Sequence, residues 1–320
     1  MALRSWLYRT RVRTWLPAAF LAGGAFLLAG VVPNACQPRR AALDPSLPAP
    51  AVRTQAFTPT LTASPTVTPT LTSTPTLTLT PSPSATPAQG EAWVIGSSAG
   101  GRPLEVYRFG EGTMVRMIVA GIHGGYESNT VALADELIAY LRENPGKVPE
   151  DKTLYILRNL NPDGLAREIG PDGRANQNGV DLNRNWDAGW AAEWDQAACW
   201  SLRPLTAGEY PHSEPETRAL AYFILVHKPD ALISYHSAAL GIFPGGKPPG
   251  AASKSLARLL SNVSGYGYPP VGGACAYTGQ LIDWASAQGA AALDVELTNH
   301  TDTDLAINLR VLSAFLNWMP

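Results

Sequence analysis

Four mostly apolar runs recur in the last two thirds of the chain, and each has the length of a buried strand. They lie at residues 114–122, 153–160, 231–235 and 290–297. A short apolar run of this kind, bounded by turn residues, is typical of a strand that is covered on both faces of its sheet.

Between and after these runs, apolar residues recur every three or four positions, and this spacing predicts helices. The helical segments are residues 127–142, 214–227, 251–263, 280–288 and 302–318. Strands that alternate with helices indicate an α/β fold with a mostly parallel or mixed central sheet and helices on both faces. In such sheets, ligands bind outside the carboxyl ends of the strands.

Local polar residues predict where two of these elements begin or end. Ser213 is the expected N-cap of the helix at 214–227, with Glu216 as its capping-box partner. The Asn-Pro-Asp-Gly sequence at residues 161–164 is expected to form a turn after the second strand.

Residues 1–36 have the composition of an export signal or membrane anchor. Four arginines and no acidic residue occur in the first 13 positions, and an uncharged, mostly apolar stretch follows at residues 15–32. This stretch is close to the lower limit for crossing a bilayer, so a cleaved signal and a retained anchor both fit. Cys36 follows Pro-Asn-Ala, which adds a lipid anchor as a third alternative. We expect an extracytoplasmic protein that is tethered to the membrane, or secreted if cleaved.

Residues 37–90 predict a disordered stalk. From position 58 to position 87, 23 of 30 residues are Thr, Pro or Ser, and no charged residue occurs from 54 to 90. Such a segment cannot bury enough apolar area to offset its ordering entropy. Residues 91–320 remain as one globular domain, which we expect to be monomeric.

Overall charge and cysteine content narrow the function classes. The formal net charge is −2, without the basic surface that nucleic-acid binding requires. The globular domain contains Cys199 and Cys275. An even pair in an exported domain permits a disulfide between two loops, and two unrelated buried thiols are the alternative.

Two histidines each end an apolar run, and one of them has a carboxylate nearby. His123 follows the first strand, His236 ends the third, and Glu127 comes four residues after His123. Two imidazoles and one carboxylate, delivered at strand ends, suit a catalytic Zn²⁺, one per chain, with a coordination position left for water. A core histidine bonded to the backbone is the alternative for either histidine alone.

The sequence Asp-Leu-Asn-Arg-Asn-Trp-Asp at residues 181–187 is too polar for a core segment and too aromatic for an ordinary loop. Asn183 and Arg184 can bind a substrate carboxylate, and Arg174 can stabilise an oxyanion. Asp181 can accept a hydrogen bond from a metal-ligating histidine.

The fourth strand carries a candidate general base. Strand alternation places Asp294 and Glu296 on one face, and the apolar residues before them predict a desolvated environment. Burial of this kind raises a carboxyl pKa into the range that suits Glu296 as a base.

The order of these motifs resembles the zinc carboxypeptidase family of the carboxypeptidase A type, from about residue 118 to the C-terminus. The most specific match is Asp-Leu-Asn-Arg-Asn-Trp at residues 181–186. The resemblance implies that His123, Glu127 and His236 bind zinc and that Glu296 is the general base and acid. It further implies that Arg174 polarises the scissile carbonyl, and that Asn183 and Arg184 bind the terminal carboxylate.

The chain departs from the family pattern at two positions. Three residues separate His123 from Glu127, where the family has two, and we keep Glu127 as the expected ligand. The position of the family's mobile active-site tyrosine falls on Cys275, and Tyr277 is the expected substitute. Ile282 aligns with the side-chain pocket, which predicts a preference for neutral or apolar C-terminal residues.

We therefore expect a zinc-dependent metallocarboxypeptidase that hydrolyses the C-terminal peptide bond of peptides. A cell-wall peptide amidase, which cleaves the bond between D-Glu and diaminopimelate, is the alternative among relatives of this family. A non-catalytic binding module is a third hypothesis, which the complete set of candidate ligands and base argues against.

Overall fold

The computed structural model describes residues 88–320, apart from residue 201 and residues 272–274. The predicted export segment and nearly all of the predicted stalk lie outside the described residues. Within residues 88–320, no helix has both the length and the apolar character needed to cross a bilayer.

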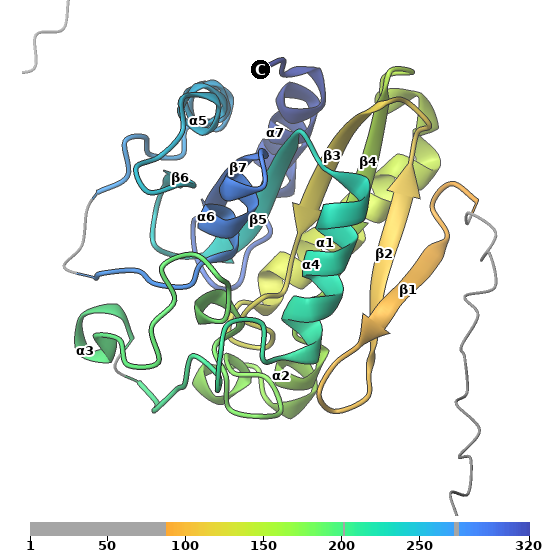
Figure 1. Cartoon of the computed structure of the whole chain (residues 1–320). Coiled ribbons are helices and arrows are strands. Elements are labelled where there is room, and N and C mark those ends of the chain that lie inside the picture. Colours follow the sequence, from red (N-terminus) through yellow and green to blue (C-terminus); the bar gives the residue numbers. More distant parts are fainter. Residues whose placement is uncertain (1–87, 201, 272–274) are drawn as a thin grey trace, which may run out of the picture. The chain divides into compact units, whose positions relative to one another are not determined.

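Seven strands form one mixed sheet in the order β1-β2-β4-β3-β5-β7-β6 (Figure 1). The central strands β4, β3, β5 and β7 are parallel, whereas β1, β2 and β6 pair antiparallel at the two edges. The strand bounds are β1 Ala92–Ser97, β2 Pro103–Phe109, β3 Met114–Val119, β4 Lys152–Leu157, β5 Ala231–Ser237, β6 Ile242–Pro244 and β7 Ala291–Leu297. The predicted α/β class with a mixed central sheet is confirmed.

Helices cover both faces of the sheet. Helices α1, α5 and α7 lie on one face, and α4 and α6 lie on the other (Figure 1). The apolar side chains of each group pack with the sheet in a separate core cluster. The helix bounds are α1 Ser128–Glu143, α2 Pro162–Arg167, α3 Gln196–Cys199, α4 Pro215–His227, α5 Ala251–Ser264, α6 Leu281–Ala287 and α7 Leu305–Asn317. Three short 3₁₀ helices lie in the connections, η1 Pro145–Lys147, η2 Pro171–Gly173 and η3 Leu182–Arg184.

The predicted strands and long helices are present, with their ends displaced by at most three residues. The sequence pattern missed the edge strands β1 and β6 and the strand β2 beside β1. Alternate residues of β1 are exposed, and β6 has only three residues, so neither forms a continuous apolar run.

Two local predictions were wrong. The Asn-Pro-Asp-Gly sequence begins helix α2, with the Asn161 side chain accepting a hydrogen bond from the backbone N–H of Gly164 at 2.8 Å. Helix α4 begins at Pro215 after Glu214, and Ser213 is not its N-cap. In both cases the helix starts at a proline, whose fixed φ angle suits the first helical position.

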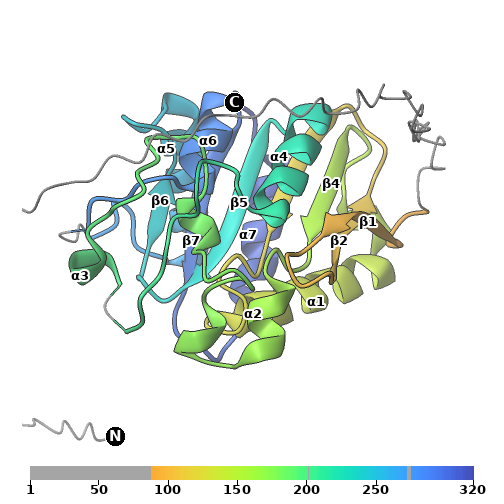
Figure 2. The ribbon, with the colours of Figure 1, turned by 60° about the horizontal axis from the view of Figure 1, so that its bottom comes forward.

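The carboxyl ends of the parallel strands lie on one side of the molecule, which Figure 2 turns toward the viewer. His123 follows β3, while His236 and Glu296 are register partners in the neighbouring strands β5 and β7. The strand order β3-β5-β7 therefore places three candidate site residues next to one another.

Candidate metal centre and active site

The loop between β3 and α1 turns Glu127 back toward His123. Its backbone closes through a hydrogen bond from the Tyr126 N–H to the His123 carbonyl at 3.0 Å. Gly124 has a positive φ of 46°, and a Cβ on Gly125 would lie 1.7 Å from the Glu168 carbonyl oxygen. Only glycine fits both requirements, so the two glycines allow the additional residue in this loop.

His123, Glu127 and His236 converge on one point. Their candidate ligand atoms all lie within 4.8 Å of one another, and all three residues are buried. Glu127 Oε1 is 2.7 Å from His123 Nδ1, and Glu127 Oε2 is 3.0 Å from His236 Nδ1. Two imidazole nitrogens and a carboxylate are a donor set that zinc accepts, so the residues present fit the ion.

The charges of these groups support metal binding. Burial by itself would raise the pKa of Glu127, but His123 and His236 outweigh it and hold that pKa below its usual range. Glu127 is therefore a carboxylate, the form that can bind a cation.

A carboxylate lies behind each of the two histidines. Asp181 Oδ1 is 3.2 Å from His123 Nε2, and Asp294 Oδ1 is 3.3 Å from His236 Nε2. These contacts orient each imidazole ring so that its Nδ1 faces the point on which the three candidate ligands converge. Asp181 was predicted in this place. The role of Asp294 was not predicted. Its place on the same strand face as Glu296 could have indicated that it lies near the site.

Arg174 lies beside the cluster, with its guanidinium fixed from several sides. Its Nε and Nη2 lie 3.0 and 2.9 Å from Asp181 Oδ2, and its Nη1 lies 3.6 Å from Glu127 Oε1. The rings of Trp200 and Tyr126 flank it, at 4.6 and 5.8 Å from their centroids to Cζ. Neither Trp200 nor Tyr126 was predicted as a site residue.

Glu296 lies next to His236 and has a strongly shifted pKa. One of its oxygens accepts a hydrogen bond from the Ala239 N–H at 2.9 Å. The pKa of Glu296 is raised to about 7, and burial is the main cause. Nearby His236 opposes this rise, and nearby Glu127 adds to it. A carboxyl group with this pKa can take up and release a proton near neutral pH.

Asn183 and Arg184 come from η3 and face the same space. The Asn183 side chain accepts a hydrogen bond from the Leu281 N–H at 3.0 Å, which fixes it against α6. Arg184 Cζ lies 4.7 Å from the Trp194 ring centroid and 5.5 Å from that of Tyr277. Arg184 is 3% exposed, its Nε has no hydrogen-bond partner among the described residues, and burial lowers its pKa.

All of these groups surround one cavity of about 840 Å³. Every predicted site residue except Asp181 lines it, including Tyr277 and Ile282. The cavity is also lined by four charged residues that were not predicted as site residues, Lys247, Lys254, Asp283 and Asp294. Asp181 is fully buried behind His123.

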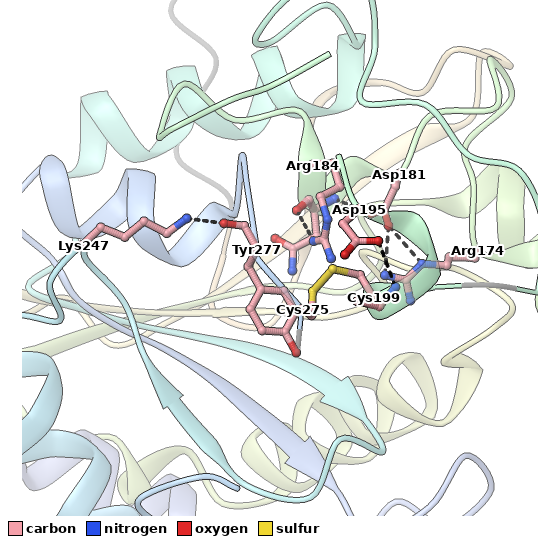
Figure 3. Close-up of a disulfide and its surroundings, with 10 residues drawn as sticks. Arg174, Asp181, Arg184, Asp195, Cys199, Lys247, Cys275 and Tyr277 are labelled. Atoms are coloured by element: carbon pink, nitrogen blue, oxygen red, sulfur yellow. Dashed lines mark hydrogen bonds and ion pairs between the residues drawn. A yellow bond between two sulfur atoms is a disulfide. The ribbon is translucent and has the colours of Figure 1, made fainter. Parts of the chain in front are cut away.

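A disulfide joins two loops at the edge of this cavity. Cys199, at the end of α3, is bonded to Cys275, two residues before Tyr277 (Figure 3). The predicted alternative of two free thiols is therefore wrong for this structure. The bridge links the segment that carries Trp200 to the segment that carries Tyr277.

A buried donor set of two histidines and a glutamate, open to a large cavity with a base and arginines on its walls, is typical of metal-dependent hydrolases. The sequence model of the family described as zinc carboxypeptidase matches residues 84–308. The chain belongs to this family, whose metal is zinc.

Two groups of curated relatives match the chain. Murein peptide amidase A of Escherichia coli strain K12 is 35% identical over 126 residues, which cover 38% of this chain and 48% of that protein. Carboxypeptidase A1 of Rattus norvegicus is 27% identical over 231 residues, which cover 61% of this chain and 54% of that protein. The chain thus spans about half the length of these relatives.

Solved structures show the same fold. The murein-tripeptide amidase of Escherichia coli O157 superposes with a TM-score of 0.55 at 24% identity, over 74% of this chain and 94% of that chain. Bovine thrombin-activatable fibrinolysis inhibitor, solved with a tick carboxypeptidase inhibitor, superposes with a TM-score of 0.55 at 22% identity, over 71% of this chain and 88% of that chain.

Proposed function

We propose that the protein is a zinc-dependent carboxypeptidase that hydrolyses the last peptide bond of its substrate. The observation that carries this proposal is Arg184, a buried guanidinium on the wall of the metal-site cavity whose Nε has no hydrogen-bond partner in the part of the chain that the structure describes. A buried cation without a carboxylate partner suits an anionic ligand, and the end of a peptide chain supplies one.

The residues of the site divide the chemistry between them. His123, Glu127 and His236 would hold zinc, which acts as a Lewis acid and lowers the pKa of water. Glu296 takes the proton from the attacking water and later gives it to the leaving amine. Arg174, held by Asp181 and the flanking rings, stabilises the oxyanion that forms on the scissile carbonyl.

The substrate's C-terminal residue binds on the opposite wall. Arg184 and Asn183 contact its α-carboxylate, and its side chain extends toward Ile282. Tyr277 is the tyrosine that closes over it, because its ring lies against Arg184 and the disulfide holds the preceding residues. The presence of all four side chains on the cavity wall supports these assignments.

Glu296→Gln tests the mechanism most directly. The variant keeps the size of the side chain but cannot accept a proton from water, so we expect loss of turnover with zinc still bound. Peptide hydrolysis and metal content of the purified protein are the two measurements. Turnover close to that of the parent protein would contradict the assigned base.

A second candidate is a peptide amidase that acts on cell-wall peptides, at the bond between D-Glu and diaminopimelate. The match to murein peptide amidase A, at the higher identity of the two curated groups, favours it. Digestion of a C-terminal Leu or Phe peptide beside a muropeptide of known sequence separates the two functions. Cleavage of the muropeptide alone would replace the first proposal by the second.

We propose further that the protein acts outside the cytoplasm as a monomer, tethered by its N-terminal segment or secreted after cleavage. The apolar stretch at residues 15–32 and the disulfide support this, because disulfides persist in oxidising compartments. Cell fractionation combined with free-thiol titration tests it. Recovery of cytoplasmic protein with reduced cysteines would contradict the location.

A further inference from the structure

The charged side chains around the cavity are not all paired with one another. Arg174 pairs with Asp181, and Lys247 Nζ lies 3.3 Å from Asp283 Oδ2. Arg184 and Lys254, in contrast, form no ion pair within 4.0 Å among the described residues. The cavity is therefore lined by two cations that have no ion-pair partner among the described residues.

The carboxylates that line the cavity already have other partners or roles. Glu127 lies against both histidines, and Asp294 lies against His236. Asp283 accepts a hydrogen bond from the Gly246 N–H at 2.9 Å in addition to its contact with Lys247. Only Glu296 remains, and it is the proposed base. No carboxylate on the described walls is thus left for Lys254.

Lys254 and Arg184 reach the cavity from different elements. Lys254 belongs to the first turn of α5, is partly buried and lines the cavity, whereas Arg184 comes from η3. Ile282 and Asp283 of α6 line the cavity as well. Lys247 pairs with Asp283 and also donates a hydrogen bond to the Tyr277 carbonyl, so it links α6 to the segment that carries Tyr277 (Figure 3).

We infer that the cavity selects substrates whose last residue carries a second carboxylate on its side chain. Arg184 binds the α-carboxylate, and Lys254 binds the side-chain carboxylate of a residue such as glutamate or an amino acid of the diaminopimelate type. This inference rests on the proposed function and corrects the preference for neutral or apolar residues that Ile282 alone predicted.

The expected selectivity follows from the environment of Lys254. A lysine that is partly removed from water binds a carboxylate better than an exposed lysine does, since water screens the contact less. We expect about tenfold higher kcat/KM for a peptide ending in Glu than for the same peptide ending in Gln, which differs only in charge.

The test measures kcat/KM of the full-length zinc protein on matched peptides that end in Glu, Gln, Leu, Lys or diaminopimelate. In Lys254→Gln the Glu-to-Gln ratio should fall to about one, and Lys254→Arg should restore most of it. Arg258→Gln is the matched control, because Arg258 is an exposed cation one turn further along α5 and does not line the described cavity. Its ratio should equal that of the parent protein.

Two results would overturn the inference. One is equal cleavage of the Glu and Gln peptides by the parent protein. The other is a Glu preference that survives in Lys254→Gln, because another group would then supply the charge. A diaminopimelate peptide that is cleaved faster than the Glu peptide would support the inference. Its side-chain carboxylate would then bind Lys254, and its side-chain amine would lie near Asp283.

A binding measurement separates this inference from the proposed reaction. N-acetyl-L-glutamate and N-acetyl-L-glutamine are titrated calorimetrically into zinc-loaded Glu296→Gln. Tighter binding of the glutamate by about tenfold, with no peptide cleaved by the parent protein, would support the selectivity and reject the carboxypeptidase reaction. Equal binding, with both peptides cleaved alike, would reject the selectivity and leave the reaction intact.

Discussion

At the scale of single residues, the site depends on charged groups that set one another's protonation. Glu127 and Glu296 both lie close to His236, yet their pKa values move in opposite directions. Glu127 contacts two imidazoles directly, so attraction outweighs burial, whereas Glu296 receives a single N–H bond and burial dominates. One carboxylate is therefore suited to hold a cation and the other to move a proton.

This difference predicts an acidic limb in the pH dependence of kcat/KM. The base works only when it is ionised, so activity should fall as the pH drops through the pKa of Glu296. That pKa is about 7 without a metal, and the ordinary value is 4.5. A bound divalent cation favours the carboxylate, so we expect the midpoint of the limb between these two values.

The measurement is a pH profile of kcat/KM with a peptide that ends in Leu. This peptide has no side-chain carboxylate for Lys254 to bind, so the profile does not depend on that contact. Metal content is assayed at each pH as the control, because protonated histidines release zinc. An activity that stays constant from about pH 5 to pH 8 would contradict Glu296 as the base.

At the scale of elements, the cavity rim is built from segments that have little regular structure of their own. Tyr126 comes from the loop before α1, Trp200 follows α3, and their rings meet edge to face at 4.6 Å between centroids. The disulfide then ties the end of α3 to the segment that precedes Tyr277. One aromatic contact and one covalent bond thus order the groups that flank Arg174 and Arg184.

Removal of the disulfide should weaken both the fold and substrate binding. The bonded cysteines are 76 residues apart in the sequence, so the bridge restricts a long loop in the unfolded chain. We expect the free energy of unfolding of the Cys199→Ser, Cys275→Ser double variant to fall by about 2–4 kcal/mol. Because the segment bearing Tyr277 is released, KM should rise more than kcat falls.

Denaturant unfolding and steady-state kinetics measure these two effects. The reduced parent protein should behave like the double variant, and added reductant should leave the double variant unchanged. A double variant as stable as the parent protein, with the same KM, would show that the bridge does not order the rim.

At the scale of the whole molecule, the order of the strands assembles the metal centre. His123, His236 and Glu296 come from positions up to 173 residues apart, and β3, β5 and β7 are neighbours in the sheet. The three candidate ligands, His123, Glu127 and His236, are buried together, so a bound ion connects segments that are far apart in the chain. Metal binding should therefore stabilise the domain as a whole.

Chelation of zinc should lower the melting temperature, and zinc should restore it. Zinc at a hundred times its Kd contributes about 2.7 kcal/mol to the folded state. For a domain of this size, that corresponds to a shift of about 5–10 °C. The His236→Ala variant is the control, since it lacks a ligand and should respond little to either treatment.

Differential scanning calorimetry with parallel metal analysis makes this measurement. A melting temperature that is the same in metal-loaded and metal-free protein would contradict a buried site formed by these three residues.

Much of the fold could be predicted because its central strands are covered on both sides. The core strands β3, β4, β5 and β7 need continuous apolar runs, and such runs are visible in the sequence. The edge strands face water on part of their surface and so leave a weaker pattern. The start of α2 was mistaken for a turn, because Asn, Pro and Gly favour both structures.

The sequence by itself determined the candidate residues, because imidazoles, carboxylates and an arginine-amide motif at strand ends are chemically distinctive. Only the tertiary structure decided that the extra residue after His123 still leaves Glu127 beside both histidines, and that Cys199 meets Cys275. It also brought Asp294 behind His236 and Lys254 into the cavity wall. Those contacts join residues far apart in the chain, and their distances depend on how the sheet and helices pack, which no local pattern records.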